Sequence, residues 1–139
     1  ESPFESAQEI VQRIHRKMSG SRGAALALAQ IFHDRGKLSF VGVGNIVSHI
    51  LERYLERGCT SIQGIVGSQL GTLKQFDYEW NNKSTLLMHS DGIKSSARID
   101  CSSSKSLSIL AAETYRDFSR ANDDASVVVI KEVVKDVLE

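Results

Sequence analysis

The feature of this sequence that most constrains its fold is a succession of short apolar segments separated by turn residues. Residues 24–32 and 38–43 are apolar and flank a polar turn at 33–36, a pattern typical of two strands joined in a hairpin. Residues 72–80 end in an alternation of aromatic and acidic side chains, and residues 85–88 form another short apolar segment. Several strands in succession, without regular βαβ alternation, predict mainly antiparallel sheets.

Two segments with helical periodicity accompany these strands. The first starts at Ser2 and Pro3, which suit the cap and the first position of a helix, and it ends at Gly20. The second covers residues 104–118, and a β-branched strand follows at 127–130. The order helix, several strands, helix, strand predicts an α+β fold.

Residues 46–55 give conflicting signals. Their apolar side chains fit a helical stripe, whereas a strand would carry apolar groups on both faces. The local pattern alone favours a helix. These apolar residues are Ile46, Val47, Ile50, Leu51, Tyr54 and Leu55.

Composition excludes several classes of protein. Seventeen basic residues balance seventeen acidic ones, so no net charge attracts the chain to nucleic acid or to a membrane surface. No apolar segment is long enough to span a bilayer. Cys59 and Cys101 occur in no metal-binding spacing and are typical of reduced thiols, although one disulfide stays an alternative. We therefore expect the 139 residues to form a single cytoplasmic domain.

Acidic residues lie beside two of the apolar strands. Asp91, followed by Gly92, comes after the strand at 85–88, and Asp123 and Asp124 precede the strand at 127–130. If these strands are neighbours in one sheet, the two acidic loops meet at the same edge. Carboxylate oxygens are the ligands that a hard divalent cation prefers. The alternative is that Asp91-Gly92 is an ordinary turn and Asp123-Asp124 a solvated loop.

His89 shares a His-x-Asp spacing with Asp91, which on a strand would place both side chains on one face. A histidine in this position is more often a packed sheet residue than a metal ligand. Asn45 follows a glycine-containing segment and is interpreted as a turn residue.

Five motifs occur in one order along nearly the whole chain. They are RGAA at 22–25, VGVGNI at 41–46, GIVG at 64–67, LLMHSDGI at 86–93, and RDF at 116–118 leading to NDDASVVV at 122–129. In this combination the sequence resembles the bacterial type-2C serine/threonine phosphatases of the stage II sporulation protein E group. It is most similar to the small X-type phosphatases of stress-response sigma-factor regulation.

The resemblance implies an α-β-β-α sandwich with a two-metal site at one edge. It implies that Asp91 and Asp123 coordinate one Mn²⁺ or Mg²⁺ ion, with Asp124 beside them as a supporting residue or turn former. Gly92, Asn45 and His89 would lie near this site. The resemblance also favours a strand over residues 46–55, against the local pattern.

The sequence departs from the family pattern at one important point. The family carries a further metal-binding aspartate in its first strands and an Asp-Gly motif whose aspartate bridges both metals. The only Asp-Gly pair here is Asp91-Gly92, which is already assigned. We therefore expect the chain to lack the first strands and the bridging ligand, and to bind one ion weakly or none.

The resemblance implies removal of phosphate from phosphoserine or phosphothreonine in a bacterial regulatory protein. We expect this chain alone to be inactive or nearly so. The alternative is a non-catalytic, phosphatase-like module that binds a protein partner. Exposed sheet edges would favour oligomers or strand exchange.

Overall fold

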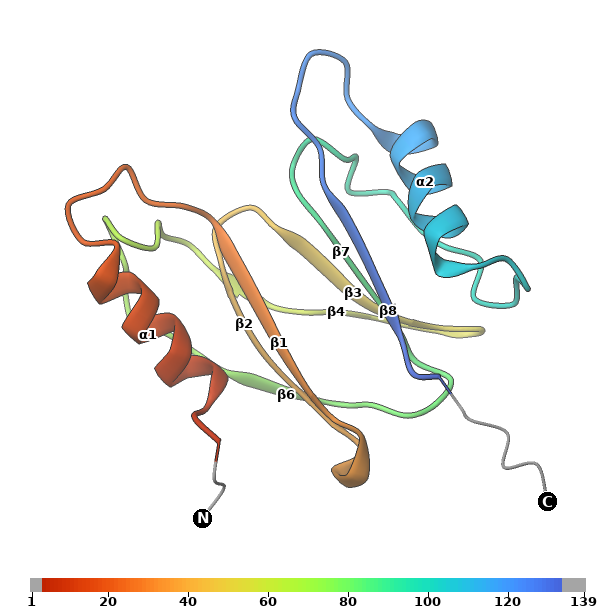
Figure 1. The fold of residues 1–139 in the computed structure, drawn as a ribbon, viewed down its shortest axis with the longest axis horizontal. Helices are drawn as coiled ribbons and strands as arrows, with labels where there is room; N and C mark the ends of the chain where they lie inside the picture. Colours follow the sequence, from red (N-terminus) through yellow and green to blue (C-terminus); the bar gives the residue numbers. More distant parts are fainter. Residues whose placement is uncertain (1–3, 134–139) are drawn as a thin grey trace. The chain divides into compact units, whose positions relative to one another are not determined.

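The computed structural model describes residues 4–133. It is an α+β structure with two helices and two four-stranded, mainly antiparallel sheets (Figure 1). The predicted fold class is therefore confirmed, and one helix with each sheet is consistent with the expected sandwich. No helix in the described part is both long and apolar enough to cross a membrane. The chain forms two compact units, comprising residues 4–47 with 59–80, and residues 48–58 with 81–133.

The first unit is built around strand β2 (Lys37–Val43). Strand β1 (Leu26–Phe32) pairs with β2 in antiparallel register over its full length. On the other side of β2, β6 (Phe76–Glu79) pairs antiparallel with its first half, and β5 (Ser61–Ile62) pairs parallel with its end. The turn between β1 and β2 is a single 3₁₀ turn, His33–Arg35, so the predicted hairpin is confirmed.

Helix α1 (Ala7–Lys17) covers one face of this sheet (Figure 1). Its apolar side packs on β2 because Ala7 and Val11 point toward Val41 and Val43, and all four side chains are fully buried or nearly so. Burying a valine side chain stabilises the fold by about 1.5–3 kcal/mol. This contact therefore anchors α1 to the sheet.

The start of α1 differs from the prediction. The helix is capped by Ser6, whose hydroxyl accepts from the Glu9 amide at 3.2 Å, while the Glu9 carboxylate accepts from the Ser6 amide at 2.8 Å. This is a capping box, in which two otherwise unpaired amides are satisfied. The predicted cap, Ser2, lies outside the described residues, as does Pro3.

The second unit contains a sheet in the order β4-β3-β7-β8. Strand β3 (Val47–Glu52) and β4 (Leu55–Gly58) form a hairpin, and β7 (Thr85–His89) pairs antiparallel with β8 (Val127–Lys131). Helix α2 (Leu107–Phe118) packs against β8, and the structure agrees with the predicted strand and helix in this region.

Residues 46–55 are strand and turn, so the helix favoured by the local pattern is wrong. Arg53 and Tyr54 form the two-residue turn of the β3–β4 hairpin, with Glu52 opposite Leu55. Ile50 and Leu51 are adjacent and both buried. A strand inside a sheet can bury both faces, and this produces the apolar pattern that resembles a helical stripe.

Helix α2 begins later than its sequence pattern indicates. Its N-cap is Ser106, whose hydroxyl accepts from the Ile109 amide at 3.4 Å, whereas the prediction started the helix at residue 104. Three serines precede the cap in a loop, where Asp100 accepts hydrogen bonds from the amide and hydroxyl of Ser102. The local bonds of Asp100 and Ser102 hold this loop outside the helix.

Candidate metal centre

The pairing of β7 with β8 brings the two acidic loops to the same end of one sheet. His89 is opposite Val127 in the last pair of the ladder. Beyond it, the Ser90 amide donates to the Ser126 carbonyl at 3.1 Å, and the Ser126 amide donates to the Ser90 hydroxyl at 3.0 Å. The loop carrying Asp91 and the loop carrying Asp123 are therefore joined where they leave the strands.

Gly92 brings the two loops into direct backbone contact. A Cβ atom at this position would overlap the carbonyl oxygen of Asp124, and it would lie 2.8 Å from the Asp124 carbonyl carbon and 3.0 Å from the Ala125 Cα. Real Cβ atoms do not approach backbone so closely. Glycine is needed here because a neighbouring backbone occupies the space of a side chain.

Arg120, two residues after the end of α2, forms hydrogen bonds with the Asp91 loop at the same junction. Its amide donates to the Gly92 carbonyl at 2.7 Å, and its Nε donates to the Asp91 carbonyl at 3.1 Å. Asn122 then adopts φ 64°, a left-handed conformation that asparagine tolerates better than most residues. The sequence analysis missed Arg120, since no local spacing connects it with the Asp91 loop.

The donors at this junction suit a hard cation but do not enclose one. Asp91, Asp123 and Asp124 are all exposed, and oxygen is the ligand atom that Mg²⁺ and Mn²⁺ prefer. Within residues 4–133, no group of three or more His, Cys, Asp or Glu side chains is arranged to hold a metal ion. Mg²⁺ commonly binds through one or two carboxylates and keeps several waters. The junction therefore supplies oxygen donors of the type that a weakly held, mostly hydrated ion uses, without forming a cluster of three ligands among the described residues.

His89 is a packed sheet residue. It is the last residue of β7, it is 2% exposed, and its Nδ1 lies 2.9 Å from the Ser90 carbonyl oxygen. A carbonyl oxygen accepts, so Nδ1 is the donor in this contact. Asp91, in contrast, lies beyond the strand in an exposed turn. The two side chains thus occupy different environments.

Asn45 belongs to the first unit, whereas Asp91 and Asp123 belong to the second. It occupies the turn between β2 and β3, after Gly44 at φ 91°, and it lines an open pocket of about 530 Å³. The interpretation of Asn45 as a turn residue agrees with the structure. Its position near a metal site stays a prediction.

A charged cluster adjoins His89 within the second unit. The Glu56 carboxylate on β4 accepts from Arg98 Nε at 2.9 Å, and it lies 3.1 Å from His49 Nδ1 on β3. Burial lowers the pKa of His49, and the positive charge of Arg98 and the proximity of His89 lower it further, while Glu56 opposes them. Burial of His49 therefore disfavours its protonated form.

No model of a known protein family matches the sequence, and no curated protein matches it. Solved structures do match. A chain from a structure of the bacterial stressosome, described as a modular system adapted to control secondary messenger signaling, has a TM-score of 0.83 and 26% identity; the match covers 92% of this chain and 69% of that one.

Two further solved structures share the fold as well. RsbX in complex with magnesium gives a TM-score of 0.74 at 16% identity, covering 90% of this chain and 63% of RsbX. The phosphatase domain of the cell fate determinant SpoIIE from Bacillus subtilis gives 0.58 at 17% identity, covering 94% of this chain and 76% of that domain. The chain therefore has a phosphatase-like fold.

Proposed function

We propose that this chain is part of a metal-dependent protein serine/threonine phosphatase domain, in which Asp91 and Asp123 bind one Mn²⁺ or Mg²⁺ ion. The observation that carries the proposal is the junction of the two acidic loops, closed by Gly92 against Asp124 and by Arg120 against Asp91. The fold shared with RsbX and SpoIIE supports it, as does the magnesium in the RsbX structure.

The residues at the junction have separate roles in this proposal. Asp91 and Asp123 supply oxygen ligands, Gly92 sets the spacing of the two loops, and Arg120 holds the Asp91 turn in place. In complete sites of this kind, divalent cations neutralise charge on the phosphoryl group and activate the attacking water. Asp124 supports the loop through its backbone, and we do not assign it as a ligand.

The substrate class that we propose is phosphoserine or phosphothreonine in a bacterial regulatory protein. Unaided hydrolysis of a phosphate monoester is extremely slow, and two metals held about 3.5–4 Å apart are the usual means of accelerating it. The described residues offer no third clustered ligand. We therefore expect this chain alone to turn over an aryl phosphate at or near the background rate.

Mn²⁺ binding tests the metal site directly. Calorimetry or water-proton relaxation of the chain should show about one weak Mn²⁺ site, which Asp91→Asn and Asp123→Asn each abolish. Asp124→Asn is the matched control, because it removes one carboxylate from the same loop. Unchanged Mn²⁺ binding in Asp91→Asn would contradict the proposed ligand set, as would an equal loss in Asp124→Asn.

A non-catalytic regulatory module is the second candidate. Its support is the absence of a three-ligand cluster within residues 4–133, together with the likeness to a stressosome chain. The coding sequence upstream of Glu1 separates the two candidates. An Asp-Gly motif after a strand would favour the enzyme, and a joined chain carrying that motif should hydrolyse p-nitrophenyl phosphate with Mn²⁺. If the joined chain binds Mn²⁺ without turnover, the regulatory module is favoured.

A further inference from the structure

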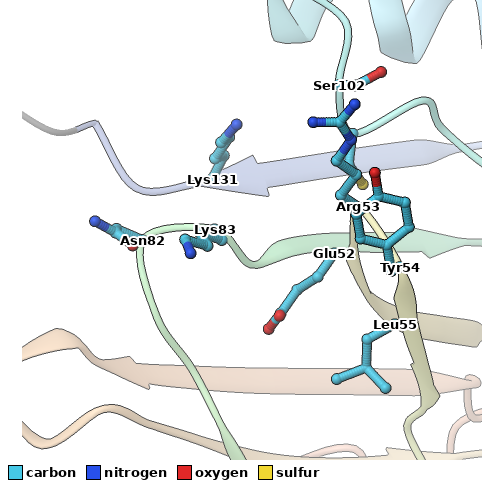
Figure 2. A pocket seen from close by; sticks show the side chains of 9 residues that line it. Glu52, Arg53, Tyr54, Leu55, Asn82, Lys83, Ser102 and Lys131 are labelled. Atoms are coloured by element: carbon cyan, nitrogen blue, oxygen red, sulfur yellow. The ribbon is translucent and has the colours of Figure 1, made fainter.

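An open pocket of about 680 Å³ lies at the opposite end of the second sheet from the acidic loops (Figure 2). Four separate segments of the second unit form it. They are the β3–β4 turn at 52–55, the loop before β7 at Asn82 and Lys83, the end of β8 at Lys131, and the loop at Cys101 and Ser102.

The lining carries an excess of positive charge. Arg53, Lys83 and Lys131 contribute three cations, and none of them forms an ion pair with a carboxylate in the part of the chain that the structure describes. Figure 2 shows the side chains of Arg53, in the β3–β4 turn, and of Lys131, at the end of β8, projecting in the same direction. Exposed ammonium and guanidinium groups in a concavity raise the local concentration of anions.

Glu52, the acidic residue that lines the pocket, already accepts hydrogen bonds from neighbouring side chains. The Glu52 side chain is 17% exposed, and its Oε1 accepts from Ser84 Oγ at 2.9 Å, from Asn81 Nδ2 at 3.2 Å and from Arg57 at 3.3 Å. Arg57 offsets the charge of Glu52, and the three donors together fix its orientation. Lys83 and Lys131 therefore face the pocket without an ion-pair partner among the described residues. Arg53 differs, because the pKa of the Asp100 carboxylate is lowered first by hydrogen bonds from Ser102 and further by the nearby charge of Arg53.

The rim of the pocket is apolar. Tyr54 is 88% exposed and Leu55 is 49% exposed, and the Arg53 guanidinium lies 5.2 Å from the centre of the Tyr54 ring. A smaller pocket of about 320 Å³ shares residues 52–55 and Cys101 and extends the hollow past the turn. This extension is also lined by Asp100 and by Glu56, which pairs with Arg98 at 2.6 Å, so the cationic part of the surface lies in the first pocket, beside the apolar rim.

We propose that this surface binds an acidic peptide segment of a partner protein. Carboxylates of the segment would pair with Arg53, Lys83 and Lys131, and an apolar side chain of the segment would pack on Tyr54 and Leu55. A compact inorganic anion uses neither the apolar rim nor cations from three separate segments. A nucleic acid is disfavoured because the chain as a whole carries no net charge. The proposal is independent of the phosphatase assignment.

Binding of a labelled peptide tests the proposal. The probe is a fluorescein-labelled peptide of glutamates around one leucine, measured by fluorescence anisotropy at low salt, with a glutamine-for-glutamate peptide for comparison. Arg53→Glu and Lys131→Glu should each weaken binding of the acidic peptide about tenfold or more, since a charge reversal replaces attraction by repulsion. Tyr54→Ala should weaken it several-fold through loss of the apolar contact.

Lys74→Glu is the matched control, because Lys74 is exposed, lies in the first unit and makes no ion pair within residues 4–133. It should leave binding unchanged. Equal binding of the glutamine peptide, or no weakening in a folded Lys131→Glu variant, would overturn the proposal. Displacement of the peptide by inorganic pyrophosphate at equal concentration would also overturn it, because it would mark a site for small anions.

The two cysteines provide a second measurement. Cys101 lines the pocket and Cys59 does not. Saturating acidic peptide should slow alkylation of Cys101 by iodoacetamide and leave the rate at Cys59 unchanged, as measured by mass spectrometry of each tryptic fragment. Peptide binding that protects neither thiol, or both equally, would place the peptide elsewhere and contradict the proposal.

Discussion

The backbone of Gly92 lies so near the carbonyl group of Asp124 that a Cβ atom at Gly92 would overlap it, although the two residues belong to different loops. The two loops leave adjacent strands of one sheet, and this contact leaves no room for a side chain between them. The backbones of the two loops are thus held against each other beside Asp91 and Asp123. The strength of this packing can be measured by adding a single methyl group.

Gly92→Ala should lower the free energy of unfolding by about 1–3 kcal/mol, because the new Cβ overlaps backbone atoms that cannot rotate away. It should also weaken Mn²⁺ binding, since separating the loops separates the carboxylates. Urea denaturation and Mn²⁺ titration measure the two effects. Gly71→Ala is the control, because a Cβ there meets nothing within 4 Å. Equal stability of the two variants would show that the loops adjust freely.

The capping box of α1 predicts the effect of a second substitution. Ser6→Ala should destabilise the protein by about 1 kcal/mol, because it removes the acceptor for the Glu9 amide and breaks the reciprocal pair. Ser19→Ala, at an exposed position past the helix end, should change stability little. Urea denaturation of both variants tests this, and a Ser6→Ala variant as stable as the parent would show that residues before Ser6 cap the helix instead.

The lowered pKa of His49 predicts a loss of stability in mild acid. In the unfolded chain the histidine takes up a proton near pH 6.5, whereas in the folded protein it stays neutral to a lower pH. Acid therefore favours the unfolded state, and the contribution of His49 to stability is complete above about pH 6.5 and is lost as the pH falls toward the folded pKa. Urea denaturation between pH 7.5 and 5.5 measures the decline.

His49→Gln should make that decline shallower, because the substituted side chain does not titrate. His33→Gln, in the exposed turn between β1 and β2, is the control and should retain the decline of the parent protein. An unchanged pH dependence in His49→Gln would mean that other groups produce the acid sensitivity.

Burial raises the pKa of the Cys101 thiol, although a hydrogen bond with Thr85 and the charge of Lys131 act in the opposite direction. The thiolate is the reactive form, so Cys101 should react with iodoacetamide more slowly than glutathione at pH 8. The difference between the reaction rates of Cys101 and glutathione should narrow as the pH rises past 9. Lys131→Gln should slow the reaction further, because it removes a charge that favours the thiolate, and a faster reaction in that variant would contradict this account.

Much of the fold could be predicted because its elements follow local rules. The hairpin at 26–43 has two apolar strands around a polar turn, and α2 and β8 follow their periodicity closely. Residues 46–55 could not be resolved locally, since burial of both Ile50 and Leu51 imitates a helix. The two-residue strand β5 has too few residues to show any period.

Part of the candidate site could also be predicted from local sequence patterns. Acidic loops beside two apolar strands suggested a shared edge, and the pairing of His89 with Val127 provides it. The roles of Asp91 and Asp123 as ligands stay predictions. The contribution of Arg120 and the basic pocket could not be read from the sequence, because each depends on segments that come together only in the folded chain.

The length of strand β7 also sets the distance between the basic pocket and the acidic loop. Its start adjoins the basic pocket and its end leads into the acidic loop, and Thr85 and His89 are four residue steps apart. At about 3.4 Å per step, the strand separates the two surfaces by roughly 14 Å. A single ligand that reaches both must therefore be a chain of at least four or five extended residues. The sheet thus sets a minimum length for any partner that binds both surfaces. Shorter molecules can bind at only one of the two ends.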